Sequence, residues 1–336
     1  MKDVLCAITL GVVASAGAAE TAGLRLWDVE MPHHDRTAGV SIWYPDGAGG
    51  EPLLYADTPV FYGVDAALDA PVQAGTYPVV LFSHGMGGTL RAQAWLGAAL
   101  AQRGAIVVSV THANSTWGDF DMSEGVKHWT RVADMSAALD AVIADPDFAD
   151  HVDLSRVMAA GFSFGGWTAL SMGGVSGNHA GLVEACMTHP QMNACDVLLS
   201  DAVRLQNIDR DVWNADYSDP RVTHVAAIEP GLIWGLEVAD AGGLVPDVLM
   251  IGLGDKGDRM QAADFDVSGL ADLLPIARVE RYAPAFHFTA MPLCKPMAAQ
   301  MLAEEGDDAI CTDPEGTNRE AVHAAIVDAM ARSLGL

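Results

Sequence analysis

The feature that most constrains the fold of this chain is a serine placed between two glycines, where residues 161–165 spell Gly-Phe-Ser-Phe-Gly. An apolar run at 157–160 precedes it, and small and apolar residues follow from 166 to 170. The apolar run predicts a short buried strand, and the segment after the turn predicts the start of a helix. A sharp strand-to-helix turn strains the backbone of its central residue, and neighbours without a Cβ leave room for it. We therefore expect the Ser163 hydroxyl to stand exposed above one end of a sheet.

Apolar runs alternate with helical patterns along most of the chain, which indicates a mostly parallel central sheet with helices on both faces, an α/β fold. A strand pair at 24–30 and 38–43 comes first. Buried strands are then predicted at 78–83, 105–110, 224–229, 247–253 and 278–282. Helices are predicted at 91–103, 130–144, 258–272, 296–305 and 319–334.

Two segments depart from this alternation. Residues 45–76 are rich in Gly, Pro, Ala and Asp, and we expect them to form a loop. Residues 174–222 contain two cysteines and several aromatic residues, and we expect an insertion or lid-like segment near the site. The whole of 20–336 is predicted to be a single domain.

A serine hydroxyl is a weak nucleophile that needs a base, and the base needs an acid that orients it. Among the histidines after Ser163, only His287 lies in a loop directly after a late strand, so His287 is the expected base. The expected acid is Asp255, which follows the predicted strand 247–253. Asp258, one turn further on, and Glu229, at the end of the preceding strand, remain alternatives for the acid.

A glycine-rich turn at 82–88 follows the first buried strand. Such a turn can point a backbone N–H at a developing negative charge. We expect the Met86 N–H to be one donor, with a neighbouring glycine as the alternative, and the Phe164 N–H to be the other. His84 is expected to fix this turn by hydrogen bonds rather than to transfer protons.

Charge excludes some classes of partner. The 336 residues include 18 Lys and Arg against 44 Asp and Glu, a net charge of −26. Nucleic acids and anionic membrane surfaces are bound through basic patches, so neither is expected as a partner. After the N-terminal segment, no apolar run is long enough to span a bilayer, and no stable membrane anchor is expected.

The N-terminus resembles a secretory signal peptide. Lys2 precedes an apolar segment at 4–13, and small residues follow at 16–18. We expect 1–19 to be removed and the protein to be periplasmic or secreted, with a buried N-terminal helix as the alternative.

Four cysteines follow the expected signal peptide, and an even number in an exported protein favours disulfides. We expect the pairs Cys186–Cys195 and Cys294–Cys311, which close short local loops. Reduced, buried thiols are the alternative.

The segments 77–87 and 161–166, together with Trp-Tyr-Pro at 43–45, resemble platelet-activating-factor acetylhydrolases and bacterial predicted dienelactone hydrolases of the α/β-hydrolase superfamily. The likeness runs from about Leu24 to the C-terminus, with the motifs in the same order. The resemblance implies a serine esterase with its triad at Ser163, Asp255 and His287. It also implies neither a metal nor an organic cofactor.

These features together predict a periplasmic or secreted serine carboxylesterase that acts on small-molecule or lipid-like esters through an acyl-enzyme. A lipase or polyester hydrolase, a peptidase and an acyltransferase are alternatives on the same triad. A catalytically silent binding protein of the same fold is a further alternative.

One other cluster deserves a prediction. His33, His34 and Asp35 are ligand types for a metal ion, but three adjacent residues in a turn do not converge easily on one point. A solvated loop is therefore expected there.

Overall fold

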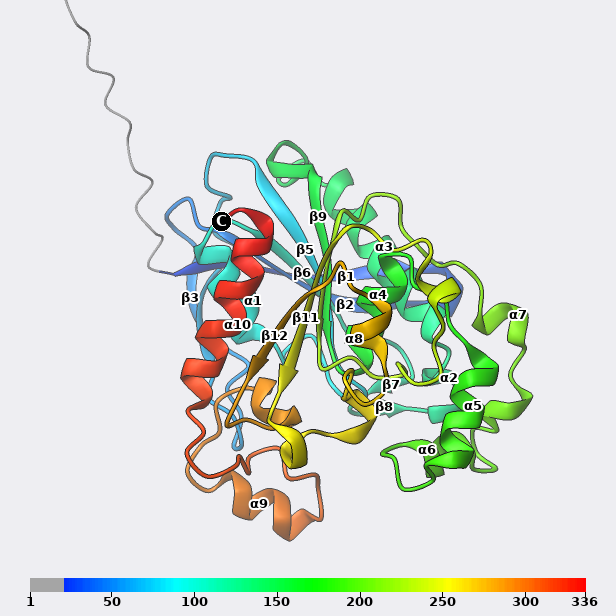
Figure 1. Ribbon diagram of the computed structural model, residues 1–336. Coiled ribbons are helices and arrows are strands. Elements are labelled where there is room, and N and C mark those ends of the chain that lie inside the picture. Colours follow the sequence, from blue (N-terminus) through cyan, green and yellow to red (C-terminus); the bar gives the residue numbers. More distant parts are fainter. Residues whose placement is uncertain (1–20) are drawn as a thin grey trace, which may run out of the picture.

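The computed structural model describes residues 21–336, so the expected signal peptide at 1–19 lies outside the described residues. Its centre is a ten-stranded sheet in the order β12-β11-β10-β9-β5-β6-β2-β1-β4-β3 (Figure 1). Neighbours from β12 to β6 pair in parallel, whereas β2 pairs antiparallel with β6 and with β1. The strands are β1 (Ala22–Met31), β2 (Arg36–Pro45), β3 (Glu51–Tyr55), β4 (Val64–Leu68), β5 (Tyr77–Ser83), β6 (Ile106–Val110), β9 (Val152–Phe162), β10 (His224–Ile228), β11 (Asp247–Leu253) and β12 (Arg278–Tyr282). A separate hairpin joins β7 (Ser115–Thr116) to β8 (Asp119–Phe120).

Helices cover both faces of the sheet, as the alternating pattern predicts (Figure 1). On one face, α1 (Ala94–Gln102) and α10 (Arg319–Leu334) share an apolar core with β9 residues Met158 and Ala160. On the other face, α3 (His128–Ala144) and α4 (Phe164–Met172) pack with Val157 and Ala159 of the same strand. The remaining α-helices are α2 (Met122–Gly125), α5 (His179–Thr188), α6 (Cys195–Leu198), α7 (Arg210–Trp213), α8 (Leu270–Leu273) and α9 (Ala298–Glu305). The predicted α/β architecture is confirmed.

Two of the predicted segments are wrong. The expected loop 45–76 contains β3 and β4, which extend the sheet beside β1. The expected helix 258–272 is reduced to two 3-10 turns, η5 (Lys256–Asp258) and η6 (Gln261–Ala263), followed by α8. The Asp264 side chain accepts from the backbone N–H groups of Asp266 and Val267, a local alternative to helical bonding, and Gly269 has a φ of 84°.

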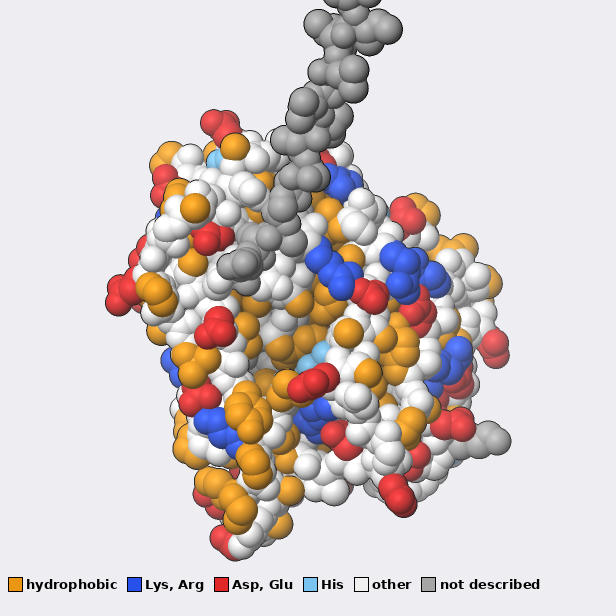
Figure 2. Space-filling model, turned by 90° about the vertical axis from the view of Figure 1, so that its left-hand side faces the viewer, with side chains coloured by type: hydrophobic (Ala, Val, Ile, Leu, Met, Phe, Trp, Pro, Cys, Tyr) orange, Lys and Arg blue, Asp and Glu red, His pale blue; other side chains and the backbone are white. Residues whose placement is uncertain are grey.

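The segment 174–222 carries α5, α6 and α7. Both expected disulfides are present: Cys186–Cys195 ties α5 to α6, and Cys294–Cys311 closes the loop that contains α9. The face of the molecule that lies on the left in Figure 1 presents scattered apolar side chains with acidic and basic ones between them (Figure 2). None of the helices within 21–336 combines the length and the apolar character needed to cross a bilayer.

Candidate active site

Ser163 occupies the turn between β9 and α4 in a strained conformation, with φ 57° and ψ −120°. The two flanking glycines are required because this turn passes very close to other backbone. A Cβ at Gly165 would overlap the carbonyl oxygen of Ser83, and one at Gly161 would overlap the carbonyl oxygen of Gly165. The Ser163 N–H donates to Ile228 O at 2.9 Å, which ties the turn to β10. The strained serine turn expected from the sequence is therefore present, with its strain held by neighbouring strands, although Ser163 is half-buried rather than exposed.

His287 begins the 3-10 helix η7 (His287–Ala290), which follows β12. Its Nε2 lies 3.1 Å from Ser163 Oγ, and the residue is 2% exposed. The Phe162 ring packs against the imidazole at a centroid distance of 4.7 Å. The structure thus brings together the serine and the histidine that the sequence singled out.

The acid that contacts His287 is Glu229, and the prediction of Asp255 is wrong. Glu229 Oε2 lies 3.1 Å from His287 Nδ1, whereas Asp255 and the alternative Asp258 are exposed. The reason lies in the order of the strands. Glu229 follows β10, which pairs directly with β9, and Ile228 is in register with Phe162, the residue before Ser163. Asp255 follows β11, one strand further away, and Gly254 turns the chain there with a φ of 95°.

Glu229 is fully buried, and both its carboxylate oxygens are engaged. Oε1 accepts the Leu253 N–H at 2.7 Å and an N–H of Arg259 at 3.3 Å, which leaves Oε2 for His287. Like Ser163, Glu229 has a positive φ, here 48°. Because the carboxylate accepts at Nδ1, the imidazole carries its proton there and presents a lone pair at Nε2 to the serine.

The two expected backbone donors lie beside Ser163. Met86, Ser163 and Phe164 line the same cavity, and Phe164 is the first residue of α4. Within 21–336, neither the Met86 nor the Phe164 N–H has a hydrogen-bond acceptor. Both amides are thus able to bind a ligand oxygen.

A buried arginine holds the turn that carries Met86. Arg131 of α3 donates to His84 O at 2.8 Å and packs over the Phe164 ring at 4.6 Å. Burial lowers the pKa of Arg131 to about 9. His84 is also buried; its Nδ1 hydrogen-bonds to Gly85 O at 2.7 Å, and its Nε2 accepts the His112 N–H. Burial and the nearby Arg131 keep the pKa of His84 well below its usual range. His84 therefore acts through hydrogen bonds, as expected.

A second serine, histidine and carboxylate are joined in the same way behind this turn. Ser83 Oγ lies 2.9 Å from His112 Nε2, and His112 Nδ1 lies 2.7 Å from Asp134 Oδ2. All three residues are at most 1% exposed. Burial, followed by the charge of Arg131, lowers the pKa of His112 to about 4. Burial raises the pKa of Asp134, but its close contacts with the imidazoles of His112, His33 and His34 outweigh this and hold it well below its usual range.

An apolar cavity of about 140 Å³ opens beside Ser163. Its wall comes from the turn after β5, from α2 and α4, from the segments that follow β10 and β11, and from the segment 174–222, including the Cys186–Cys195 disulfide. Among the residues that line it are Met86, Met122, Leu182, Met192, Leu198 and Trp234.

Comparison with solved structures identifies proteins with a similar fold. A ferulic acid esterase from Streptomyces cinnamoneus aligns with a TM-score of 0.58 at 18% identity, over 96% of this chain and 91% of that one. A dienelactone hydrolase-like promiscuous phosphotriesterase from metagenomic libraries aligns with a TM-score of 0.53 at 18% identity, over 94% and 100% of the two chains. The chain has the α/β-hydrolase fold.

Sequence comparisons point to esterases of this fold. Residues 61–119 match the family model of platelet-activating factor acetylhydrolase, isoform II. Cutinase 2 of Thermobifida cellulosilytica is 30% identical over 129 residues, which is 38% of this chain and 40% of that protein. Cutinase cut1 of Thermobifida fusca is also 30% identical over 129 residues, 38% of this chain and 33% of that protein. The matches therefore span well under half the length of these curated relatives.

The sequence analysis did not single out Arg131 and Asp134, although the pattern of buried positions along α3 could have indicated them. Met135 and Ala138 belong to the buried face of this helix, and residues three or four positions before them share that face. A charged residue on an apolar face marks a buried polar network. That signal picks out Arg131 and Asp134 but not their partners, which come from distant strands.

Proposed function

We propose that this protein is a serine carboxylesterase that hydrolyses carboxylic esters through an acyl-enzyme. The observation that carries the proposal is the hydrogen-bonded series Ser163, His287 and Glu229 at the edge of an apolar cavity. The similarity of parts of the chain to cutinases and to platelet-activating factor acetylhydrolase supports an ester as the substrate.

In the first half of the reaction, Ser163 Oγ attacks the ester carbonyl carbon while His287 Nε2 takes the hydroxyl proton. The carbonyl oxygen becomes an oxyanion, which the N–H groups of Met86 and Phe164 stabilise. Glu229 holds the imidazole in the correct tautomer and stabilises the imidazolium. Collapse of the tetrahedral intermediate breaks the ester C–O bond, and His287 returns the proton to the leaving alcohol.

In the second half, water attacks the acyl-enzyme and His287 again serves as the base. The second tetrahedral intermediate uses the same two N–H groups and releases Ser163 with a carboxylic acid as product. Each oxyanion donor contributes on the order of 3 kcal/mol to lowering the barrier in enzymes of this kind.

The apolar cavity is a suitable place for the acyl group or another apolar part of a small ester. Lipase, polyester hydrolase, peptidase and acyltransferase activities use the same reacting groups, so substrate choice has to be measured. The purified mature chain should be assayed on soluble esters of increasing acyl length, on insoluble triglyceride and polyester, and on peptides, with Ser163→Ala as the control. Turnover of soluble esters that is absent from Ser163→Ala is expected. Turnover confined to peptides would overturn the proposal.

We further propose that the protein is exported, which the two disulfides and the signal-like N-terminus support. Intact mass of protein from its native compartment should show the loss of about 18–19 N-terminal residues. It should also show four fewer hydrogens than the fully reduced chain, two for each disulfide. Free thiols at Cys186 and Cys195 would contradict this.

A further inference from the structure

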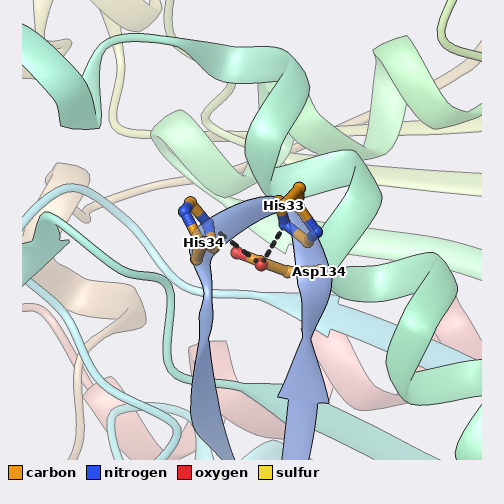
Figure 3. A group of neighbouring side chains, drawn as sticks. All are labelled: His33, His34 and Asp134. Carbon is orange, nitrogen blue, oxygen red and sulfur yellow. Dashed lines mark hydrogen bonds and ion pairs between the residues drawn. The ribbon is translucent and has the colours of Figure 1, made fainter.

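A cluster of two histidines and one carboxylate lies at the turn between β1 and β2 (Figure 3). His33 and His34 belong to the 3-10 helix η1 (Pro32–His34), and the third member is Asp134 from α3, not the neighbouring Asp35. Asp134 Oδ1 lies 2.8 Å from His33 Nε2 and 3.3 Å from His34 Nε2. The solvated loop expected for this turn is thus wrong for His34, whose side chain is only 10% exposed.

The cluster contains a buried nitrogen that makes no hydrogen bond within the described residues. His34 Nε2 is shielded from solvent, and its approach to Asp134 Oδ1 at 3.3 Å lacks the geometry of a hydrogen bond, so it has no hydrogen-bond partner within 21–336. Asp134 Oδ1 already bonds to His33 Nε2. A buried polar atom without a partner is costly, so such an atom in a native protein calls for an explanation. A cation between the three side chains would satisfy it.

The orientation of the Asp134 carboxylate is fixed by a hydrogen bond on the side away from the histidine pair. Asp134 Oδ2 bonds to His112 Nδ1 at 2.7 Å, and His112 is in turn fixed by Ser83 Oγ. Oδ1 is therefore the oxygen left to face the histidine pair. Oriented ligands of this kind, with a hydrogen-bonded second layer, are characteristic of metal sites in proteins.

We propose that His33, His34 and Asp134 bind one zinc ion, with solvent as the fourth ligand. Zinc takes histidine nitrogen and carboxylate oxygen at about 2.0–2.2 Å, which places ligand atoms around a tetrahedral ion about 3.3–3.5 Å apart. The three ligand atoms here lie within 4.8 Å of one another, so small rotations of the side chains suffice. Calcium and magnesium prefer sites made of oxygen ligands and fit this set poorly. His33, at 26% side-chain exposure, provides the route for solvent and for the ion.

The ion would tie the β1–β2 turn to α3, the helix that also carries Arg131. No hydrogen bond or ion pair among the described residues joins these three ligands directly to Ser163 or His287, so the proposed ion stabilises the fold and takes no part in ester hydrolysis. The inference is independent of the proposed esterase activity.

The test uses the full mature chain without a polyhistidine tag, dialysed against Zn²⁺ near neutral pH. One zinc per chain is expected, with a rise in melting temperature because the ion binds the folded state. Co²⁺ in place of Zn²⁺ should give the visible absorption bands of four-coordinate cobalt. His33→Ala and His34→Ala should each lose at least about tenfold in Zn²⁺ affinity, because loss of even a residue that only orients a ligand costs about 10–100-fold.

Two controls keep the test decisive. His151→Ala removes a partly exposed histidine that bonds to Gly75 O, and Ser163→Ala removes the nucleophile; both should bind zinc like the parent. Melting temperatures without zinc show that each variant is folded, which avoids reliance on the fully buried Asp134. Unchanged zinc affinity in both His33→Ala and His34→Ala, or the absence of stoichiometric binding by the parent, would overturn the proposal.

Discussion

The molecule contains two hydrogen-bonded series of serine, histidine and carboxylate, and they differ in what surrounds them. In the first, Ser163 and Glu229 lie 3.1 Å from the two nitrogens of His287. In the second, Ser83 and Asp134 lie 2.9 and 2.7 Å from those of His112. The second has the shorter contacts, yet it has none of the other features that catalysis requires.

The difference lies in access and in backbone geometry. Ser163 stands at a strained turn beside a cavity and two backbone N–H groups that have no acceptor in the part of the chain that the structure describes. Ser83 ends a regular strand, is 1% exposed, and its Oγ accepts from Arg131 at 3.3 Å. A serine, a histidine and an acid within bonding distance therefore do not make an active site by themselves. We call Ser83, His112 and Asp134 the inner series and Ser163, His287 and Glu229 the outer series. In the proposed mechanism the outer series performs the chemistry, and the inner series supports the turn that carries Met86.

The largest expected effect is a difference in kcat between alanine variants of the two serines, Ser163 and Ser83. Ser163→Ala should lower kcat by a factor on the order of 10⁶, because the members of such a triad act as a unit. Ser83→Ala should cost about 1–3 kcal/mol of stability, since it leaves buried polar partners unpaired, and should change kcat by less than about tenfold. Steady-state kinetics and urea unfolding of both variants check this. If Ser163→Ala retained more than about a tenth of the parent activity, Ser163 would not be the nucleophile and the two serines would not differ in the way proposed.

The next test compares the two candidate acids, Glu229 and Asp255. Glu229→Gln should lower kcat by roughly 10⁴, because the amide no longer enforces the tautomer of His287. Asp255→Asn is the matched control and should leave kcat at the parental value, since Asp255 is exposed. A greater loss from Asp255→Asn than from Glu229→Gln would reverse the assignment of the acid.

Arg131 links the two series, and its removal should have an intermediate effect. Arg131→Met takes away the donors to His84 O and to Ser83 Oγ, so the Met86 N–H should move. A displacement of about 1 Å can cost on the order of 10²-fold in rate, and we expect a loss of that size in kcat with little change in KM. Arg332→Met, which removes an exposed ion pair with Glu280, serves as the control. Equal kinetics for the two variants would show that the inner series does not support the site.

The smallest expected effect is on how the free energy of unfolding depends on pH, through His323, which contacts the turn that carries His287. His323 Nε2 bonds to Thr289 O in the turn that carries His287, and burial lowers the pKa of His323 to about 4. An unfolded histidine titrates near 6.5. Between about pH 6.5 and 4 the unfolded chain binds more protons, so stability should fall as the pH falls through this range.

His323→Gln keeps a donor toward Thr289 O but cannot take up that proton. The unfolding free energy of this variant, measured by urea titration from about pH 7 to 4, should fall less steeply with pH than that of the parent. The difference in slope should correspond to at most one bound proton. His151→Gln should follow the parent. A parallel decline in all three proteins would show that His323 does not contribute.

Local sequence patterns were enough to predict two of the three members of the outer series but not the third. Ser163 and His287 are each marked by a strand, a turn and a residue type, which are local features. The choice between Glu229 and Asp255 depends on which strand is the neighbour of β9, and strand order is not written in any local pattern. The disulfide pairs could be predicted because each closes a short loop.

The inner series and the histidine cluster could not be predicted because they are assembled from distant segments. Asp134 meets His112 and the His33–His34 pair only after α3 has packed on the sheet, 22 and about 100 residues away along the chain. The single available signal was the pair of charges at Arg131 and Asp134 on the buried side of α3.

The most direct test of the central claim is covalent labelling with a fluorophosphonate, which reacts with a serine only where that serine is activated and accessible. Intact mass should show one adduct per chain, and peptide mapping should place it on Ser163. Ser163→Ala should take up no label, and Ser83→Ala should take up the parental amount. Labelling of a different serine, or none in a folded parent protein, would contradict the account.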